Sequence, residues 1–154
     1  MSPIERRLLA AALVCGAVLI WDLRADHDVV LAQRHKPIMV THVFSGSDGL
    51  SHVETIEMKL TANGDTELSE MMKVSGLQFR RQAPDFFQDY HPASRKQYVI
   101  TLSGEGEIEL TTGQKIVARA GDVLLMEDVT GKGHISRGRG TEDRVTLFVP
   151  IVDK

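Results

Sequence analysis

HPASRKQYVITLSGEGEIELTTGQKIVARAGDVLLMEDVTGKGHISR, residues 91–137, is the stretch of sequence that decides the fold of this chain. Its two apolar runs, residues 98–102 and 123–126, are separated by strand-like segments and glycine-bearing turns. Short strands closed by turns every 8–12 residues or so are typical of an antiparallel sandwich or barrel. Such a fold brings residues that are far apart in the sequence into one cavity. His91, Gln97 and His134 are therefore candidates to meet there.

The length and composition of the chain allow one domain with one core. Its 154 residues are 42% hydrophobic and 25% charged, which is ordinary for a globular protein. The net charge is −3 and the 18 basic residues are scattered, so the clustered basic face of a nucleic-acid-binding protein is missing. We therefore expect no nucleic acid partner. The single Cys15 cannot form an intrachain disulfide and says nothing about the redox compartment.

The N-terminus departs from this ordinary composition. Arg6 and Arg7 precede a mostly apolar run over residues 8–21, and a basic segment followed by a short apolar stretch is typical of a secretory signal. The run is short for a transmembrane helix, which needs about 20 residues. We therefore expect residues 1–25 to be a hydrophobic helix that serves as a signal peptide or membrane anchor, with residues 26–37 as a linker. The protein would then be exported (periplasmic or secreted) or anchored; the alternative is a buried or dimer-forming helix in a cytoplasmic protein.

Residues 51–60 alternate with period two, which predicts a strand. The face that carries Ile56 and Met58 is expected to be buried. His52 and Glu54 would then point the same way, nearer the end of the strand.

Other local signals complete the strand pattern. Asn63-Gly64 is a strong hairpin signal, residues 68–74 fit either a short helix or an irregular edge, and residues 83–92 are predicted to be an aromatic-rich loop. Residues 144–150 are the predicted closing strand. About eight strands are expected in all, which suits a small closed or double-sheet barrel.

Residues 103–107 (SGEGE), 120–125 (AGDVLL) and 133–134 (GH) resemble the motifs of the cupin family. Cupins are double-stranded β-helix (jelly-roll) barrels. The resemblance implies an all-β barrel over residues 38–152, preceded here by the one N-terminal hydrophobic helix. It also implies a site inside the barrel, where the family carries three histidines and a glutamate.

The metal ligands of the family are only partly present. Counting back from Gly104 places Gln97 where cupins usually have glutamate, His91 at the first histidine position and Ala93 at the second. His134 takes the third histidine position. The resemblance thus implies a metal site of His91, Gln97 and His134 for Fe, Zn, Mn or Ni. An amide oxygen is an uncharged, weak donor, so this site would bind more weakly than the family's full set unless another carboxylate joined it.

The same residues also support chemistry without a metal. His134 with Asp128 nearby can serve as a general acid or base, since an unperturbed imidazole titrates near neutral pH. Tyr90, next to His91, is a candidate acid. We therefore name His134, Tyr90 and Asp128 as candidate catalytic residues.

Two further residues are candidates to bind the substrate. Gln97 can hydrogen-bond a polar group, and Arg81 can hold a carboxylate by a bidentate contact. Arg80 is the alternative to Arg81, because adjacent residues of a strand point to opposite faces and only one of the two can face inward.

The sequence therefore predicts a small cupin enzyme that acts on a small organic molecule in the barrel cavity, with a divalent metal if the histidines bind one. The alternative is a non-catalytic barrel that binds or senses a small ligand, which the loss of metal ligands at Ala93 and Gln97 favours. The sequence leaves open whether the protein is an enzyme. We expect a homodimer formed through an edge strand, as is common in the family, and contact with a membrane only through the N-terminal segment.

Overall fold

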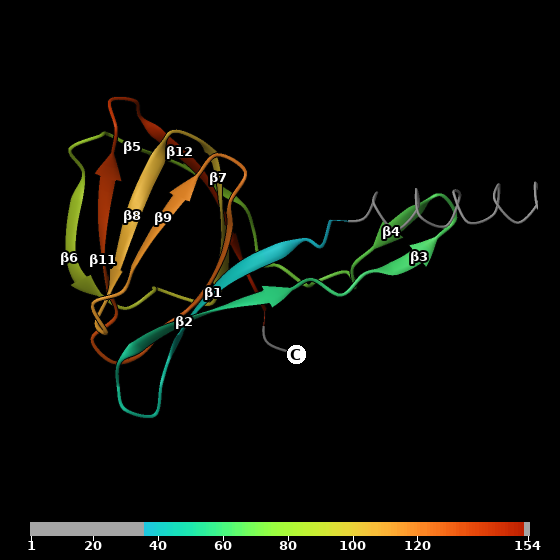
Figure 1. The fold of residues 1–154 in the computed structure, drawn as a ribbon, viewed down its shortest axis with the longest axis horizontal. Coiled ribbons are helices and arrows are strands. Elements are labelled where there is room, and N and C mark those ends of the chain that lie inside the picture. The colour runs from blue at the N-terminus through green and yellow to red at the C-terminus, as the bar shows by residue number, and fades with distance from the viewer. Residues whose placement is uncertain (1–35, 153–154) are drawn as a thin grey trace, which may run out of the picture. The chain divides into compact units, whose positions relative to one another are not determined.

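The structure is a computed structural model that describes residues 36–152. The expected signal or anchor segment, residues 1–25, lies outside the described residues, as does most of the expected linker. The described part contains twelve strands and no helix, so the all-β prediction is confirmed (Figure 1). The strands are β1 (Met39–Ser45), β2 (Ser51–Glu57), β3 (Thr61–Asn63), β4 (Thr66–Leu68), β5 (Gln78–Gln82), β6 (Phe87–His91), β7 (Gln97–Ser103), β8 (Glu105–Leu110), β9 (Lys115–Arg119), β10 (Val123–Glu127), β11 (His134–Arg139) and β12 (Arg144–Pro150). Within residues 36–152 no helix is long and apolar enough to cross a membrane.

Two sheets make the barrel. The larger has the strand order β2-β1-β10-β7-β12-β5 and the smaller the order β6-β11-β8-β9. β1 and β10 pair in parallel, whereas the other neighbours in both sheets are antiparallel. β3 and β4 form a separate hairpin. Strands adjacent in a sheet are often far apart in the sequence, which is how the fold gathers distant residues around one cavity.

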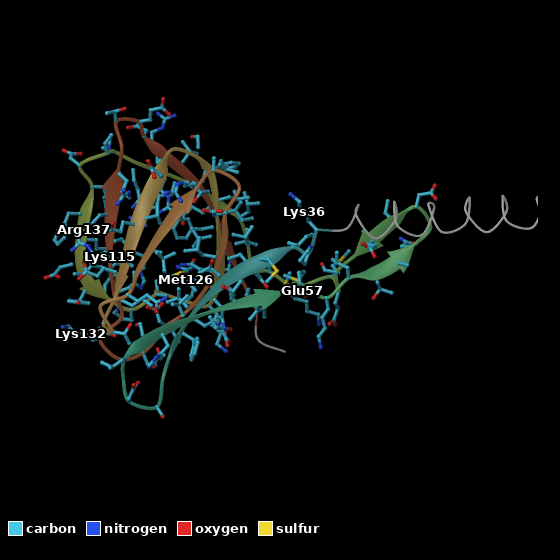
Figure 2. All side chains as sticks on the ribbon, in the orientation of Figure 1. Lys36, Glu57, Lys115, Met126, Lys132 and Arg137 are labelled. Carbon is cyan, nitrogen blue, oxygen red and sulfur yellow. The ribbon has the colours of Figure 1, made fainter. Side chains whose placement is uncertain are left out.

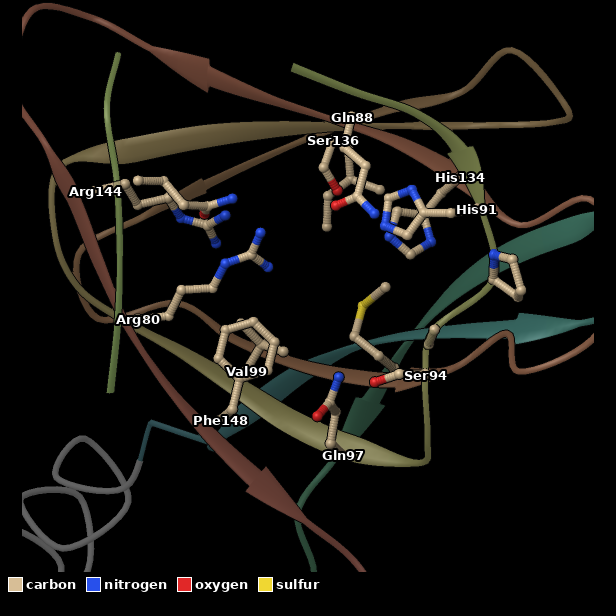
Figure 3. A pocket seen from close by; sticks show the side chains of 15 residues that line it. Arg80, Gln88, His91, Ser94, Gln97, Val99, His134, Ser136, Arg144 and Phe148 are labelled. Atoms are coloured by element: carbon tan, nitrogen blue, oxygen red, sulfur yellow. The ribbon is translucent and has the colours of Figure 1, made fainter. Parts of the chain in front are cut away.

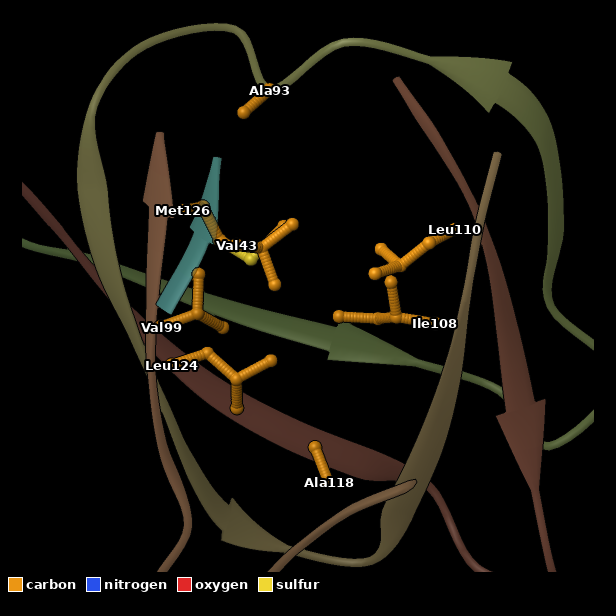
Figure 4. Close-up of a cluster of buried hydrophobic side chains, with 8 residues drawn as sticks. All are labelled: Val43, Ala93, Val99, Ile108, Leu110, Ala118, Leu124 and Met126. Carbon is orange, nitrogen blue, oxygen red and sulfur yellow. The ribbon is translucent and has the colours of Figure 1, made fainter. Parts of the chain in front are cut away.

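The hydrophobic core lies between the two sheets (Figure 4). Period two explains its membership: along β7 the residues Gln97, Val99 and Thr101 are buried, while Tyr98 and Ile100 between them are only partly buried. Burying an aliphatic side chain stabilises the fold by about 1.5–3 kcal/mol. The buried cluster consists of Val43, Ala93, Val99, Ile108, Leu110, Ala118, Leu124 and Met126.

The predicted orientation of the second strand is only partly correct. Near the start of β2, Ser51 and Val53 face the interior, whereas His52 and Glu54 lie on the outer side and form hydrogen bonds there. Ile56 and Met58, on the predicted face, are partly buried, while Thr55 and Glu57 beside them are exposed. The prediction is therefore wrong for His52 and Glu54 and correct for the apolar residues that follow them.

One other local prediction needs correction, and two are confirmed. The aromatic-rich segment predicted as a loop contains β6, which pairs with β11. Of the two alternatives for residues 68–74, a short helix or an irregular edge, the structure shows the second: after β4 the chain is irregular as far as an isolated bridge between Val74 and Ile151. The hairpin at Asn63-Gly64 is present, with Asn63 opposite Thr66 and Gly64 at a φ of 62°. The strand count of about eight is too low because it missed short and edge strands.

Candidate active site

A cavity of about 260 Å³ lies inside the barrel. Its lining residues come from β5, β6, β7, β8, β10, β11 and β12, and from the loop after β6, so both sheets contribute (Figure 3). The lining combines polar side chains with the apolar Val99, Ile108 and Met126. None of the described residues that line it is acidic.

One end of the cavity carries a buried histidine–carboxylate pair. His134, the first residue of β11, places its Nδ1 2.6 Å from Oδ2 of Asp128. Asp128 is fully buried and also accepts a hydrogen bond of 3.1 Å from the Ser51 hydroxyl. A carboxylate only accepts, so the neutral imidazole carries its proton on Nδ1 and leaves Nε2 as an acceptor. Because His134 lines the cavity, this basic nitrogen is available to a molecule bound there.

His91 stands beside His134. Their ring centroids are 4.5 Å apart, and the rings are tilted by 55°. The Nδ1–H of His91 donates to the backbone carbonyl of Asp89 at 2.7 Å, and its Nε2 has no hydrogen-bond partner among the described residues. Burial lowers the pKa of His91; the bond to Asp89 opposes this shift, and the neighbouring His134 adds to it. His91 is therefore neutral at neutral pH.

A glycine makes the approach of the two histidines feasible. Gly133 has a φ of 76°, a backbone conformation that glycine adopts without strain. A Cβ at this position would collide with the carbonyl of His91 and the nitrogen of Pro92. The backbone before His134 thus packs directly against the end of β6.

An irregularity in β6 also shapes the site. The register between β6 and β11 shifts between the pairs His134–His91 and Ser136–Gln88. Bulges of this kind re-aim side chains and are common near active sites. Here the shift lets Gln88 and His91 both line the cavity although they are three positions apart.

The other end of the cavity carries two arginines. Figure 3 shows the guanidinium groups of Arg80 (β5) and Arg144 (β12) directed into the cavity from the side opposite the two histidines. Nη2 of Arg144 donates to the hydroxyl of Thr101 at 2.9 Å, while its buried Nε has no partner among the described residues. The Arg80 guanidinium carbon lies 5.1 Å from the ring centre of Phe86 and 5.6 Å from that of Phe148.

Burial lowers the pKa of both arginines, and the charge of Arg80 adds to this effect at Arg144, where Asp122 opposes it. Arginine nevertheless stays protonated in proteins. Burial is the largest cause at both residues, so both cations are partly desolvated. Within residues 36–152, neither Arg80 nor Arg144 forms an ion pair.

The residues predicted from the cupin motif lie around this cavity. His91, Gln97 and His134 all line it, and so does Ala93, the position where the family carries its second histidine. Asp128 lies behind His134 and acts on the cavity only through that ring.

Two predicted residues lie elsewhere. Tyr90 is absent from the lining, and its ring packs under the ammonium group of Lys132 at 3.8 Å. Arg81 is outside the cavity, with Nε 3.8 Å from the carboxylate of Asp143 and its side chain 75% exposed. The inward arginine is Arg80, because β5 turns that face of its period-two pattern toward the interior.

Several residues that line the cavity or support the site were not identified from the sequence. Arg144 and Phe148 share a parity in the closing strand with the buried Thr146, so the period-two pattern carried a signal for both. Ser51, which holds Asp128, had no such signal because its strand was assigned the wrong inward face.

The outer surface holds a second cluster of histidine and carboxylates. Nδ1 of His42 lies 2.8 Å from Glu54, and its Nε2 lies 2.8 Å from Glu127. His52 contacts Asp48 at 3.0 Å. These contacts connect β1 to β2 and β10 outside the cavity, so His52, Glu54 and Glu127 are not available to supplement the candidate site.

The donor set of the cavity fits a metal ion poorly. Among residues 36–152, no three His, Cys, Asp or Glu side chains gather in a way that could hold one. Two imidazoles and the neutral amide of Gln97 remain, and no carboxylate lines the cavity to offset the two guanidinium charges. The reaction proposed for this site therefore involves only side chains of the protein.

Comparisons with known proteins assign this chain to no family. No protein-family model matches the chain, and no curated protein matches it in sequence. One similar solved structure is a Salmonella typhimurium LT2 protein assigned as ethanolamine utilization protein Q, at 14% identity and a TM-score of 0.40 over 77% of this chain and 100% of that one. Another is dTDP-6-deoxy-D-glucose-3,5-epimerase from Legionella pneumophila, in complex with dTDP-4-keto-L-rhamnose, at 11% identity and a TM-score of 0.38 over 76% of this chain and 74% of that one.

The strand order is consistent with a double-sheet, jelly-roll barrel. The two facing sheets and the all-β strand order agree with the architecture that the motif residues implied. At these identities and TM-scores, neither solved structure transfers an activity, a ligand or a site residue to this chain.

Proposed function

We propose that this cupin-like barrel is a small-molecule enzyme that catalyses proton transfer, with Nε2 of His134 as the base. The observation that carries the proposal is the 2.6 Å contact between Nδ1 of His134 and the fully buried Asp128, with the same imidazole lining a cavity. A histidine oriented by a buried carboxylate is a common arrangement for general acid–base catalysis.

The proton can be followed through this pair. A bound substrate gives a proton to Nε2 of His134, and the ring becomes an imidazolium. Nδ1–H keeps its bond to Asp128, whose negative charge stabilises the cation. The imidazolium then returns the proton to another atom or face of the substrate, so the base is regenerated and no oxidant or reductant is consumed. His91, held neutral beside it, can hydrogen-bond the reacting group.

The cavity also bears on the size of the substrate. Pockets for drug-sized ligands are usually about 300–1,000 Å³, and this one is about 260 Å³. The substrate is therefore a small organic molecule. Gln97, Gln88 and Ser136 line the cavity and offer amide and hydroxyl groups that can orient it.

Solvent deuterium exchange tests this proposal without knowledge of the natural substrate. The full-length protein would be incubated in D₂O with a panel of small ketones, aldoses and oxo acids, and incorporation of deuterium followed by mass spectrometry. We expect exchange on at least one compound, and a loss of about 100-fold or more in His134→Gln. His52→Gln is the matched control, because His52 also contacts an aspartate but lies outside the cavity. Exchange at the unaltered rate in His134→Gln would refute the role of His134.

The second candidate is a non-catalytic barrel that binds a small ligand. The position of Tyr90 favours it, because Tyr90, the expected acid, lies outside the cavity. Among the described residues, His91 is then the titratable group beside the base, His134. A ligand that binds at micromolar concentration and is recovered without exchange or conversion would support this candidate over the enzyme.

A further inference from the structure

The charge distribution around the cavity is one-sided. The chain as a whole has a net charge of −3. The described lining of the cavity nevertheless contains two arginines and no carboxylate. Both guanidinium groups lie at the end away from His91 and His134 (Figure 3).

The environment of Arg144 is unusual for a cation. The residue is only 6% exposed, and its Nε has no partner among the described residues. Buried charges in proteins are generally paired, because taking an ion out of water is costly. The hydrogen bond that its guanidinium donates, to Thr101, is to a neutral hydroxyl. A second cation, Arg80, lines the same cavity and raises the cost further.

The surrounding residues hold both arginines in place. A Cβ on Gly106 would lie 2.7 Å from Nη1 and 2.9 Å from Cδ of Arg144, so the glycine provides the space in which that side chain lies. Phe86 and Phe148 flank the guanidinium of Arg80. Contact with an aromatic ring stabilises a guanidinium and leaves its N–H edge free for an anion.

We propose that Arg80 and Arg144 form the binding site for an oxyanion group, a carboxylate or a phosphate, of the small molecule that occupies the cavity. Guanidinium groups present paired N–H donors that match such groups. The ligand is then a small organic acid or phosphoester whose anion lies at the arginine end and whose reacting atom lies at the histidine end. This inference rests on the proposed function for its second half only, because anion binding does not require His134.

Thermal unfolding of the full-length protein with defined anions tests the site. The probes are malonate, acetate and inorganic phosphate at 10 mM, each against chloride of equal ionic strength. We expect at least one probe to raise the Tm of the wild type by about 3 °C or more. The larger shift, carboxylate or phosphate, identifies the group that the site prefers.

Variants separate a ligand site from a structural one. Arg80→Met is expected to weaken binding of the effective probe at least tenfold, by calorimetric titration, since a charge-assisted bond is lost. The same substitution should not lower the Tm without anion, because it removes a partly buried cation that has no anionic partner among the described residues. Arg144→Lys keeps the charge but loses the planar group, and should also weaken binding at least tenfold. Arg81→Met, adjacent but exposed and paired with Asp143, should bind as the wild type does.

Three outcomes would overturn the inference: no anion-specific shift in the wild type, unaltered affinity in Arg80→Met, or equal losses in Arg80→Met and Arg81→Met. The two proposals fail separately. If the arginine variants lose anion binding while His134→Gln retains full exchange activity, the anion site stands and the catalytic role of His134 falls. If His134→Gln abolishes exchange while the arginine variants bind anions normally, the catalytic role of His134 stands and the anion site falls.

Discussion

The imidazole rings of His91 and His134 lie with their centroids 4.5 Å apart, although one ends β6 and the other begins β11. Each ring has its Nδ1 bonded on the side away from the cavity, His91 to a backbone carbonyl and His134 to Asp128. Both Nε2 atoms are therefore available for proton transfer or hydrogen bonding. Figure 2 shows the side chains that surround the strands of the barrel; the proposed chemistry uses the few of them that line the cavity.

Asp128→Asn tests whether the carboxylate is needed to orient and charge-stabilise His134. The substitution keeps the size of the side chain but removes the negative charge that stabilises the imidazolium. We expect exchange activity to fall by about 100-fold or more, with anion binding at the arginine end retained. Asp48→Asn is the matched control, because Asp48 makes a similar contact with His52 on the surface. Equal activity in both variants would contradict the assignment.

Gly133→Ala tests the close approach of β11 to β6. The new Cβ would require a positive φ and would collide with the backbone of His91 and Pro92. We expect the free energy of unfolding to fall by about 2–4 kcal/mol, measured by urea denaturation. Gly113→Ala is the control, since Gly113 has a φ of 83° with no atom within 4 Å of an added Cβ; it should lose only about 1–2 kcal/mol. Similar decreases in the free energy of unfolding for both variants would show that the close contact of Gly133 with His91 and Pro92 does not contribute to the effect.

His91 gives a pH dependence whose sign follows from its lowered pKa. Burial disfavours the protonated ring, so the folded-state pKa lies below the ordinary 6.5. As pH falls below about 6.5, the unfolded state takes up a proton that the folded state resists, and stability declines. Urea denaturation from pH 8 to pH 5 should show this decline in the wild type and a smaller one in His91→Asn. An equal decline in both would show that His91 is not its source.

The surface carboxylates act in a different pH range. The pKa of Asp48 is lowered by its hydrogen bond to His52, and that of Glu109 by its hydrogen bond to Arg137. Their stabilisation is present above their unfolded-state values, 3.8 and 4.5, and is lost as pH falls through the lower folded-state values. The loss of stability caused by His91 therefore begins at a higher pH than the loss caused by Asp48 and Glu109.

Ala93→His combined with Gln97→Glu tests the match to the cupin metal motif. Both positions line the cavity with His91 and His134, so the two substitutions would complete three histidines and one glutamate. We expect well under 0.1 metal ion per chain in the wild type (a rough figure from its weak donor set). In the double variant we expect about one Zn, Ni, Mn or Fe per chain. Elemental analysis of untagged protein measures both; no gain in the variant would show that the four positions do not converge.

The edge strand β5 is where we expect two copies to associate. It ends the larger sheet, and it carries Phe79, which is 68% exposed, next to Leu77, which is 59% exposed. An exposed edge with apolar side chains favours pairing with another chain. Light scattering after size exclusion should show a dimer for the wild type and a monomer for Phe79→Glu. Phe87→Glu, at another edge strand where Arg137 lies over the ring, should remain a dimer.

Period-two alternation and glycine turns were enough to predict an all-β barrel, because the local sequence pattern indicates where strands and turns form. The resemblance to the cupin motif, together with the expected barrel, predicted that His91, Gln97 and His134 line one cavity. Asp128 was predicted to lie near His134, which it precedes by six positions, and the two side chains are in contact. The role of residues 1–25 remains a prediction from sequence.

Tertiary packing decided the rest. Period two states that Arg80 and Arg81 point to opposite faces, but only the packing of β5 decides that Arg80 faces inward. The bulge opposite β11 brings Gln88 and His91 to the same cavity, against simple alternation. Ser51 reaches Asp128 only because β2 turns its less hydrophobic face to the interior. Alternation fixes the period of a strand, whereas the face that is buried depends on the neighbouring strands and sheets, which lie elsewhere in the chain.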